Sequence, residues 1–113
     1  MCILLDECVN PRVREAFPGH SVRVVQGSAL AGYFDGPLLQ YAAARFDVFV
    51  TRDKQLPFQQ NLSRLPLGVV IAVVADNRIE SFRPLFNALN QAVEGVRPGE
   101  VIWVARRGTA GTY

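Results

Sequence analysis

The sequence predicts an α/β protein in which a mainly parallel sheet is covered by helices on both faces, a three-layer α/β/α sandwich. Short apolar segments alternate with longer segments whose apolar residues recur at helical spacing, and this alternation favours parallel strands joined by helices. Half of the 113 residues are hydrophobic and 19% are charged, which argues for a folded domain and against a disordered chain. We expect one domain over residues 1–105 and a flexible tail over residues 106–113.

The first part of the chain predicts two strands and a helix. Residues 2–5 form a short apolar run, which is typical of a buried strand. Asn10 precedes Pro11, so an N-cap and a proline at the first helical position predict a helix over residues 11–17. Residues 21–25 alternate and end in two valines, which indicates a second strand.

The middle of the chain predicts a loop, a helix and a third strand. Residues 26–34 are rich in Gly, Ala and Ser and are expected to form a loop. Asp35 then begins a helix, whose apolar stripe ends near Phe46. Residues 48–51 form the third strand, and residues 54–64 form either a short helix or an ordered loop.

The last part of the chain predicts a central strand, one long helix and a final strand. Residues 69–74 contain only Val, Ile and Ala, so we expect a strand that is covered on both faces. Residues 79–93 carry apolar side chains at helical spacing and predict a single helix. Residues 101–104 form the last predicted strand.

Acidic residues gather where the predicted strands end. Asp6 and Glu7 directly follow the first strand, and Asp53 lies two residues past the third. Asp35 begins the helix that leads into the third strand. In a parallel sheet the carboxyl ends of the strands meet at one edge, where ligands bind. We therefore expect these four side chains to converge, although they are far apart in the sequence.

Such a cluster predicts a metal site. Neighbouring carboxylates repel one another unless a cation neutralises them. Oxygen ligands without His or Cys favour Mg²⁺ or Mn²⁺, whereas the two cysteines and one histidine of this chain are too few to suggest zinc. A metal of this kind activates water and stabilises charge on a phosphate, so the acids point to metal-assisted phosphoryl chemistry.

The same acids also have structural interpretations. Asp35 could serve only as a helix N-cap, and Glu7 could be an exposed loop residue. Asp53 could pair with Arg52 or Lys54, because surface ion pairs are common.

Three further residues carry expectations of their own. Asp76 follows the fourth strand, and a turn or helix cap is the favoured interpretation. Asn10 is expected to cap its helix, although its side chain could also face the site. Cys8 lies near the first acids, and negative neighbours should raise the pKa of its thiol and leave it unreactive.

A series of short motifs runs along residues 2–105. In chain order they are Leu4-Leu5-Asp6-Glu7, Asn10-Pro11, Gly19-His20-x-Val22, Asp35-Gly36-x-Leu38-Leu39, Phe46-Asp47-Val48-x-Val50-Thr51-x-Asp53-Lys54, Leu56-Pro57-x-Gln59-Gln60-Asn61-Leu62, Asn77-Arg78 and Arg97-Pro98-Gly99-Glu100. In their order and spacing, these motifs resemble the compact PIN-like proteins of the DUF5615 type, which are described as predicted nucleases of toxin–antitoxin systems.

The resemblance implies a PIN-like sandwich with a metal-dependent ribonuclease site. The family's acids map onto Asp6, Asp35 and Asp53, which would hold Mg²⁺ or Mn²⁺, with Glu7 beside them as a fourth catalytic residue. RNA is then the implied substrate, a cognate antitoxin protein the implied partner, and a homodimer a further association to consider. The candidate substrate-binding residues are Asn10, Arg52, Lys54, Gln59 and Asn61.

Other classes of protein stay open. The same fold could be a catalytically weak or inactive module that binds RNA or a protein. A phospho-acceptor receiver domain also has acids after its first and third strands, but it needs a lysine after the fifth strand, where this chain has Ala105 and Arg106. No segment approaches the ~18 consecutive apolar residues of a membrane span, and no signal peptide is evident. We therefore expect a cytoplasmic protein that does not bind membranes.

Overall fold

A computed structural model of the chain describes residues 1–25, 35–106 and 109–111. The strands are β1 (Cys2–Leu5), β2 (Ser21–Val24), β3 (Val48–Thr51), β4 (Gly68–Ala72), β5 (Val101–Ala105) and β6 (Thr109–Gly111). The α-helices are α1 (Asp35–Arg45), α2 (Leu56–Gln59), α3 (Ile79–Phe82) and α4 (Phe86–Gly95). Three 3₁₀ helices complete the described elements: η1 (Pro11–Ala16), η2 (Leu62–Arg64) and η3 (Arg83–Leu85).

The strands form one sheet in the order β2-β1-β3-β4-β5-β6. The first five strands in this order run parallel, and β6 pairs antiparallel with β5. The predicted α/β fold with a mainly parallel sheet is therefore confirmed. The strand order reverses between β1 and β3, with β2 and β1 on one side of this point and the other strands on the other side. Ligands bind at such switch points in sheets of this kind.

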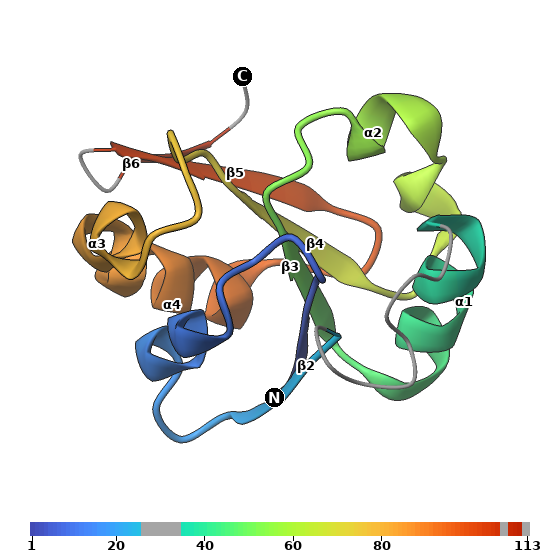
Figure 1. Cartoon of the computed structure of the whole chain (residues 1–113). Helices are drawn as coiled ribbons and strands as arrows, with labels where there is room; N and C mark the ends of the chain where they lie inside the picture. Colours follow the sequence, from blue (N-terminus) through green and yellow to red (C-terminus); the bar gives the residue numbers. More distant parts are fainter. Residues whose placement is uncertain (26–34, 107–108, 112–113) are drawn as a thin grey trace.

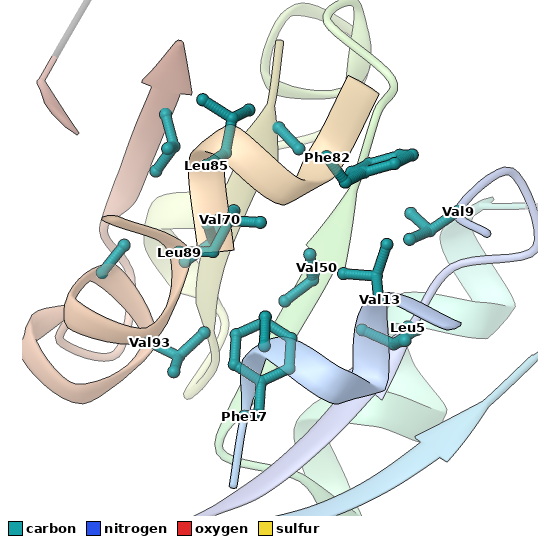
Figure 2. Close-up of a cluster of buried hydrophobic side chains, with 14 of the residues drawn as sticks. Leu5, Val9, Val13, Phe17, Val50, Val70, Phe82, Leu85, Leu89 and Val93 are labelled. Carbon is teal, nitrogen blue, oxygen red and sulfur yellow. The ribbon is translucent and has the colours of Figure 1, made fainter. Parts of the chain in front are cut away.

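Helices cover both faces of the sheet, as Figure 1 shows: α1 and α2 lie on one side, and η1, α3 and α4 lie on the other. Alternate residues of each strand supply the two cores. Leu5, Val50 and Val70 face the core beneath η1, α3 and α4 (Figure 2). Leu4 and Phe49 face the core beneath α1 and α2. The three-layer α/β/α arrangement follows from this alternation, because a strand side chain points to opposite faces at successive residues.

The central position predicted for the fourth strand is confirmed. Every residue of β4 is buried, and its neighbours β3 and β5 pair with it on either side. The strand begins one residue earlier and ends two residues earlier than the apolar run 69–74. Residues 54–64 fold as α2 and η2, in keeping with the predicted short helix or ordered loop.

The single helix predicted over residues 79–93 is wrong. The segment forms α3, a 3₁₀ turn η3 and then α4. Pro84 lies in η3, and a proline has no backbone N–H to donate to the preceding turn of an α-helix. The apolar residues on both sides of the break still face one core: Phe82, Leu85 and Leu89 are all buried there.

Two other predictions concern the C-terminal tail and the loop over residues 26–34. The tail was expected to be frayed over residues 106–113, but Thr109–Gly111 pairs with β5 as β6. The expected loop 26–34 lies outside the described residues. None of the helices in the described ranges is long and apolar enough to cross a membrane.

Candidate functional site at the ends of β1 and β3

Asp6 and Asp53 lie at the carboxyl ends of two neighbouring strands. β1 and β3 are parallel, with Leu5 opposite Val50. The amide of Asp6 continues this ladder by donating to the carbonyl of Val50 at 2.9 Å. Asp53 follows β3 by two residues. Both side chains are partly buried. The topology therefore brings together two acids that are far apart in the sequence, at the switch point of the sheet.

Thr51, the last residue of β3, links the two acids. Its side-chain hydroxyl donates to Oδ2 of Asp6 at 2.7 Å and accepts a hydrogen bond from the backbone amide of Asp53 at 3.0 Å. Thr51 is fully buried, so its hydroxyl needs such partners. The link fixes the Asp6 carboxylate relative to the backbone that carries Asp53.

The remaining oxygens of the two carboxylates are partly engaged with backbone amides. Oδ1 of Asp6 accepts from the amide of Glu7 at 2.7 Å, and Oδ1 of Asp53 accepts from the amide of Gln55 at 2.9 Å. The second contact holds the turn that leads into α2. These amides orient both carboxylates at the edge of the sheet.

The structure describes less of the other two predicted acids. Glu7 is exposed, although its backbone amide contacts Asp6. Asp35 is the first residue of α1, as predicted, but its side chain lies outside the described part of the structure. α1 and α2 cover the same face of the sheet (Figure 1). The structure therefore describes a pair of acids, Asp6 and Asp53, rather than the full predicted set of four.

The donor chemistry of this pair fits Mg²⁺ or Mn²⁺. No group of three His, Cys, Asp or Glu side chains that could hold a metal occurs among the described residues. Zinc sites need more ligands than this. Mg²⁺ is commonly held by one or two carboxylates together with water and substrate phosphates. Asp6 and Asp53 are the described acids that could supply those carboxylates.

Arg52 directly precedes Asp53 in the sequence, and its side chain reaches the loop that follows β1. One of its terminal guanidinium nitrogens, Nη1, donates to the carbonyl of Cys8 at 3.3 Å. Its Nε is inaccessible to solvent and has no hydrogen-bond partner in the described structure. Lys54, on the other side of Asp53, is exposed. Two cations therefore flank Asp53, one partly buried and one exposed.

Cys8 contacts the Asp6–Thr51 pair from the loop after β1. Its Sγ lies 3.5 Å from Oδ2 of Asp6 and 3.5 Å from the hydroxyl of Thr51. Burial raises the pKa of the Cys8 thiol above its ordinary value, and the negative charge of Asp6 raises it further. The predicted rise is confirmed, with burial as the larger cause. A raised pKa leaves less of the nucleophilic thiolate, so the surroundings of Cys8 do not activate its thiol.

Asn10 caps η1, as predicted, with its side-chain oxygen accepting from the amide of Arg12 at 2.9 Å. Its side-chain nitrogen donates to the carbonyl of Asn77. Asp76 is a turn residue, which is one of its two predicted roles, and the N-cap position of α3 is Arg78. Asp76 accepts from the Ser81 hydroxyl at 2.7 Å and from the amide of Arg78 at 3.0 Å. Those two hydrogen bonds, Ser81 first, lower the pKa of Asp76.

Gln59 and Asn61 do not join the acids. Both line a surface hollow that also includes Gly99 and Val101, and Val101 is the first residue of β5. The hollow therefore extends to the amino ends of the strands, whereas Asp6 lies at the carboxyl ends. Asn61 also accepts a hydrogen bond from the hydroxyl of Ser63 at 2.8 Å.

Two residues at the site, Thr51 and Asn77, received no functional prediction from the sequence. Thr51 has a recognisable signal, because a polar residue at the end of a strand buried on both faces must find a partner. Asn77 has a weaker one, since an Asn after a strand is usually a turn residue.

Comparison with protein-family models, curated proteins and solved structures finds no match to this chain. The fold and site themselves define a doubly wound α/β protein with paired carboxylates at its switch point. Receiver domains share this strand order, but Arg106 follows β5 where a receiver has its lysine.

Proposed function

We propose that this protein is a metal-dependent ribonuclease of the PIN-like type and the toxin component of a cytoplasmic toxin–antitoxin pair. The observation that carries the proposal is the Asp6–Thr51–Asp53 link, which ties the Asp6 carboxylate to the backbone amide of Asp53 at the switch point of a parallel sheet. The resemblance of the motifs to DUF5615-type proteins supplies the toxin assignment and the expected antitoxin partner.

The roles of the residues follow from their positions. Asp6, Asp53 and Asp35 would hold Mg²⁺ or Mn²⁺, which when bound activates water and stabilises charge on the phosphate under attack. Thr51 orients the Asp6 carboxylate through a hydrogen bond to one of its oxygens. Arg52 and Lys54 would offset the charge of the RNA backbone. Glu7, which is exposed beside Asp6, would orient the attacking water.

The test is cleavage of structured RNA in the presence of Mn²⁺ or Mg²⁺. Asp6→Asn and Asp53→Asn should each abolish the cleavage, because the amide keeps the side-chain shape but loses the charge that binds the metal. Glu80→Gln is the matched control, since Glu80 is an exposed acid on α3. Equal cleavage by wild type and Asp6→Asn would show that the activity comes from a contaminant or another site.

A second candidate is a module of the same fold that binds RNA or a partner protein without cleaving it. One observation favours it: the described residues contain no group of three acids able to hold a metal. The two candidates differ in a single experiment. RNA that binds at micromolar protein and stays intact with Mn²⁺ would support the binding module, whereas metal-dependent cleavage lost in Asp53→Asn would support the nuclease.

A further inference from the structure

We propose that the hollow between α2 and β5 binds one base of a single-stranded RNA. The two residues that follow Asp53 in the chain, Lys54 and Gln55, line this hollow. The hollow is lined by Lys54, Gln55, Phe58, Val73 and Trp103 and has a volume of about 310 Å³. That volume lies at the small end of ligand pockets, so it suits a single planar group. The inference rests on the proposed function, since it names how the same site would hold its substrate.

Phe58 is the first reason to expect a ligand here. Phe58 is 78% exposed, more than Met1 at 45%, the other exposed large hydrophobic residue in the described ranges. Phe58 lies in α2, whose other apolar residue Leu56 is buried in the core. An exposed aromatic ring at the rim of a hollow offers a π face on which a base can stack.

Trp103 is the second reason. The residues of β4 are all buried, whereas Val101 and Trp103 of β5 are only partly buried. Both of these side chains pack at the margin of the core beneath α1 and α2. That face of β5 is therefore incompletely covered, and the Trp103 side chain forms a second aromatic wall of the hollow opposite α2.

Charge and position favour RNA over other ligands. Lys54 is exposed and lies at the hollow, where it can contact a phosphate. The carboxylate of its neighbour Asp53 accepts a hydrogen bond from the amide of Gln55 at 2.9 Å. One short turn therefore connects Asp53 to the residues that line the hollow. A cation next to stacking aromatics is the combination found in sites for single-stranded nucleic acids. A base seated here would place an adjoining phosphate near the acids.

Trp103 makes the test direct, because it is the only tryptophan of the chain. A single-stranded oligonucleotide of about eight residues, added in EDTA, should quench its fluorescence in a saturable way. Phe58→Ala should weaken this binding by about fivefold or more, as expected for loss of one stacked base. Phe58→Leu should weaken it similarly, because leucine keeps an apolar surface but has no π face.

Lys54→Met supplies the electrostatic arm of the experiment. It should lower the affinity and reduce the slope of log affinity against log salt by about one. Arg14→Met is the matched control, since Arg14 is an exposed cation of η1, which covers the other face of the sheet (Figure 1). It should leave the quench and its salt dependence unchanged.

The outcomes separate this inference from the proposed function. Saturable quenching that depends on Phe58, without RNA cleavage in Mn²⁺, would support the base site and contradict the nuclease. Cleavage with an unchanged KM in both Phe58 variants would support the nuclease and overturn the base site. An oligonucleotide that fails to quench Trp103, or a Phe58→Leu variant that binds as tightly as wild type, would also overturn it; in the latter case an apolar protein segment is the better ligand.

Discussion

Asn10 and Asn77, 67 residues apart in the sequence, hold each other through two hydrogen bonds. The backbone amide of Asn10 donates to Oδ1 of Asn77 at 2.9 Å, and the side-chain nitrogen of Asn10 donates to the carbonyl of Asn77 at 2.9 Å. The pair ties the loop after β1 to the loop after β4. Because the side-chain oxygen of Asn10 caps η1, this residue braces the edge of the sheet on which Asp6 lies.

The bracing role predicts a loss of stability on mutation. Asn10→Ala removes an N-cap, worth about 0.5–2 kcal/mol, and also the link to Asn77. We expect a total of about 2 kcal/mol, with a coupling energy of about 0.5–3 kcal/mol between Asn10→Ala and Asn77→Ala. Urea unfolding of the single and double variants measures both values. Asn87→Ala, at an exposed position of α4, is the control, and additive effects of the pair would contradict a direct link.

Much of the sheet could be predicted because its signals are local. Buried strands appear as short apolar runs, and five of the observed strands begin within one residue of the predicted positions. The break at Pro84 was missed because the apolar spacing continues through it on the same buried face. Strand β6 was missed because residues 109–111 carry no apolar alternation, and their pairing with β5 depends on a partner rather than on their own pattern.

The site was predictable only at the level of topology. Parallel strands place Asp6 and Asp53 at one edge, and this needs nothing beyond the order of elements. The role of Thr51 depends on the rotamer that brings its hydroxyl to Asp6, which is 45 residues away in the sequence. No local pattern in the sequence indicates that contact. Gln59 and Asn61 are candidate substrate-binding residues through the motif of the resemblance, but both line the hollow that reaches the start of β5.

Thr51 should matter to both stability and the acid pair. Thr51→Val keeps the shape but removes the hydroxyl, so Oδ2 of Asp6 loses its hydroxyl donor and the Asp53 amide loses its acceptor. An unmade buried hydrogen bond costs about 1–3 kcal/mol, so we expect a loss in that range on chemical denaturation. Thr51→Ser keeps the hydroxyl and should retain the RNA cleavage that Thr51→Val loses. Full activity in Thr51→Val would show that Asp6 is oriented without this residue.

Metal binding should raise the melting temperature of the protein. A ligand that binds only the folded state stabilises it by RT ln(1 + [L]/Kd), about 2.7 kcal/mol at a hundredfold excess over Kd. We expect Mn²⁺ to produce such a shift in wild type, and Asp53→Asn to remove most of it. Glu80→Gln should behave as wild type. A Tm shift that survives in both Asp6→Asn and Asp53→Asn would place the metal elsewhere.

Cys8 should react slowly with alkylating reagents. Its pKa is raised by burial and by Asp6, so at neutral pH little of it is the reactive thiolate. In a Cys2→Ser background, the iodoacetamide rate should therefore rise only at higher pH than for an unfolded control. Asp6→Asn should shift this profile to lower pH, because it removes the negative charge beside the thiol. The shift should reverse less than half of the rise in the Cys8 pKa, because burial is the larger cause of that rise. A profile identical to that of the unfolded chain would contradict the raised pKa.

The same shift makes stability depend on pH. The folded state disfavours the Cys8 thiolate, so the contribution of the neutral thiol is fully present below the pKa of the unfolded chain. It is lost as the pH rises through the higher folded value. Unfolding free energy measured across the alkaline range should therefore fall more steeply in the Cys2→Ser protein than in the Cys2→Ser, Cys8→Ser protein.

Gly99, in the turn before β5, should tolerate alanine poorly. Its φ is +85°, and the Glu100 amide donates to the carbonyl of Arg97 at 3.0 Å, so Pro98 and Gly99 form the centre of a tight turn. A Cβ at Gly99 would lie 2.9 Å from the carbonyl oxygen of Ser63, and backbone atoms cannot move aside cheaply. Gly99→Ala should therefore cost more than the ~1 kcal/mol expected from the positive φ alone.

Gly95, in the last turn of α4, is the matched control for Gly99. A Cβ there would meet nothing within 4 Å, and alanine is favoured over glycine in a helix by about 1 kcal/mol. Gly95→Ala should therefore be neutral or stabilising in the same urea titration in which Gly99→Ala is destabilising. Because both substitutions add one methyl group at the surface of the same domain, a difference of sign isolates the turn. Equal effects of the two would show that the Ser63 contact relaxes at no cost.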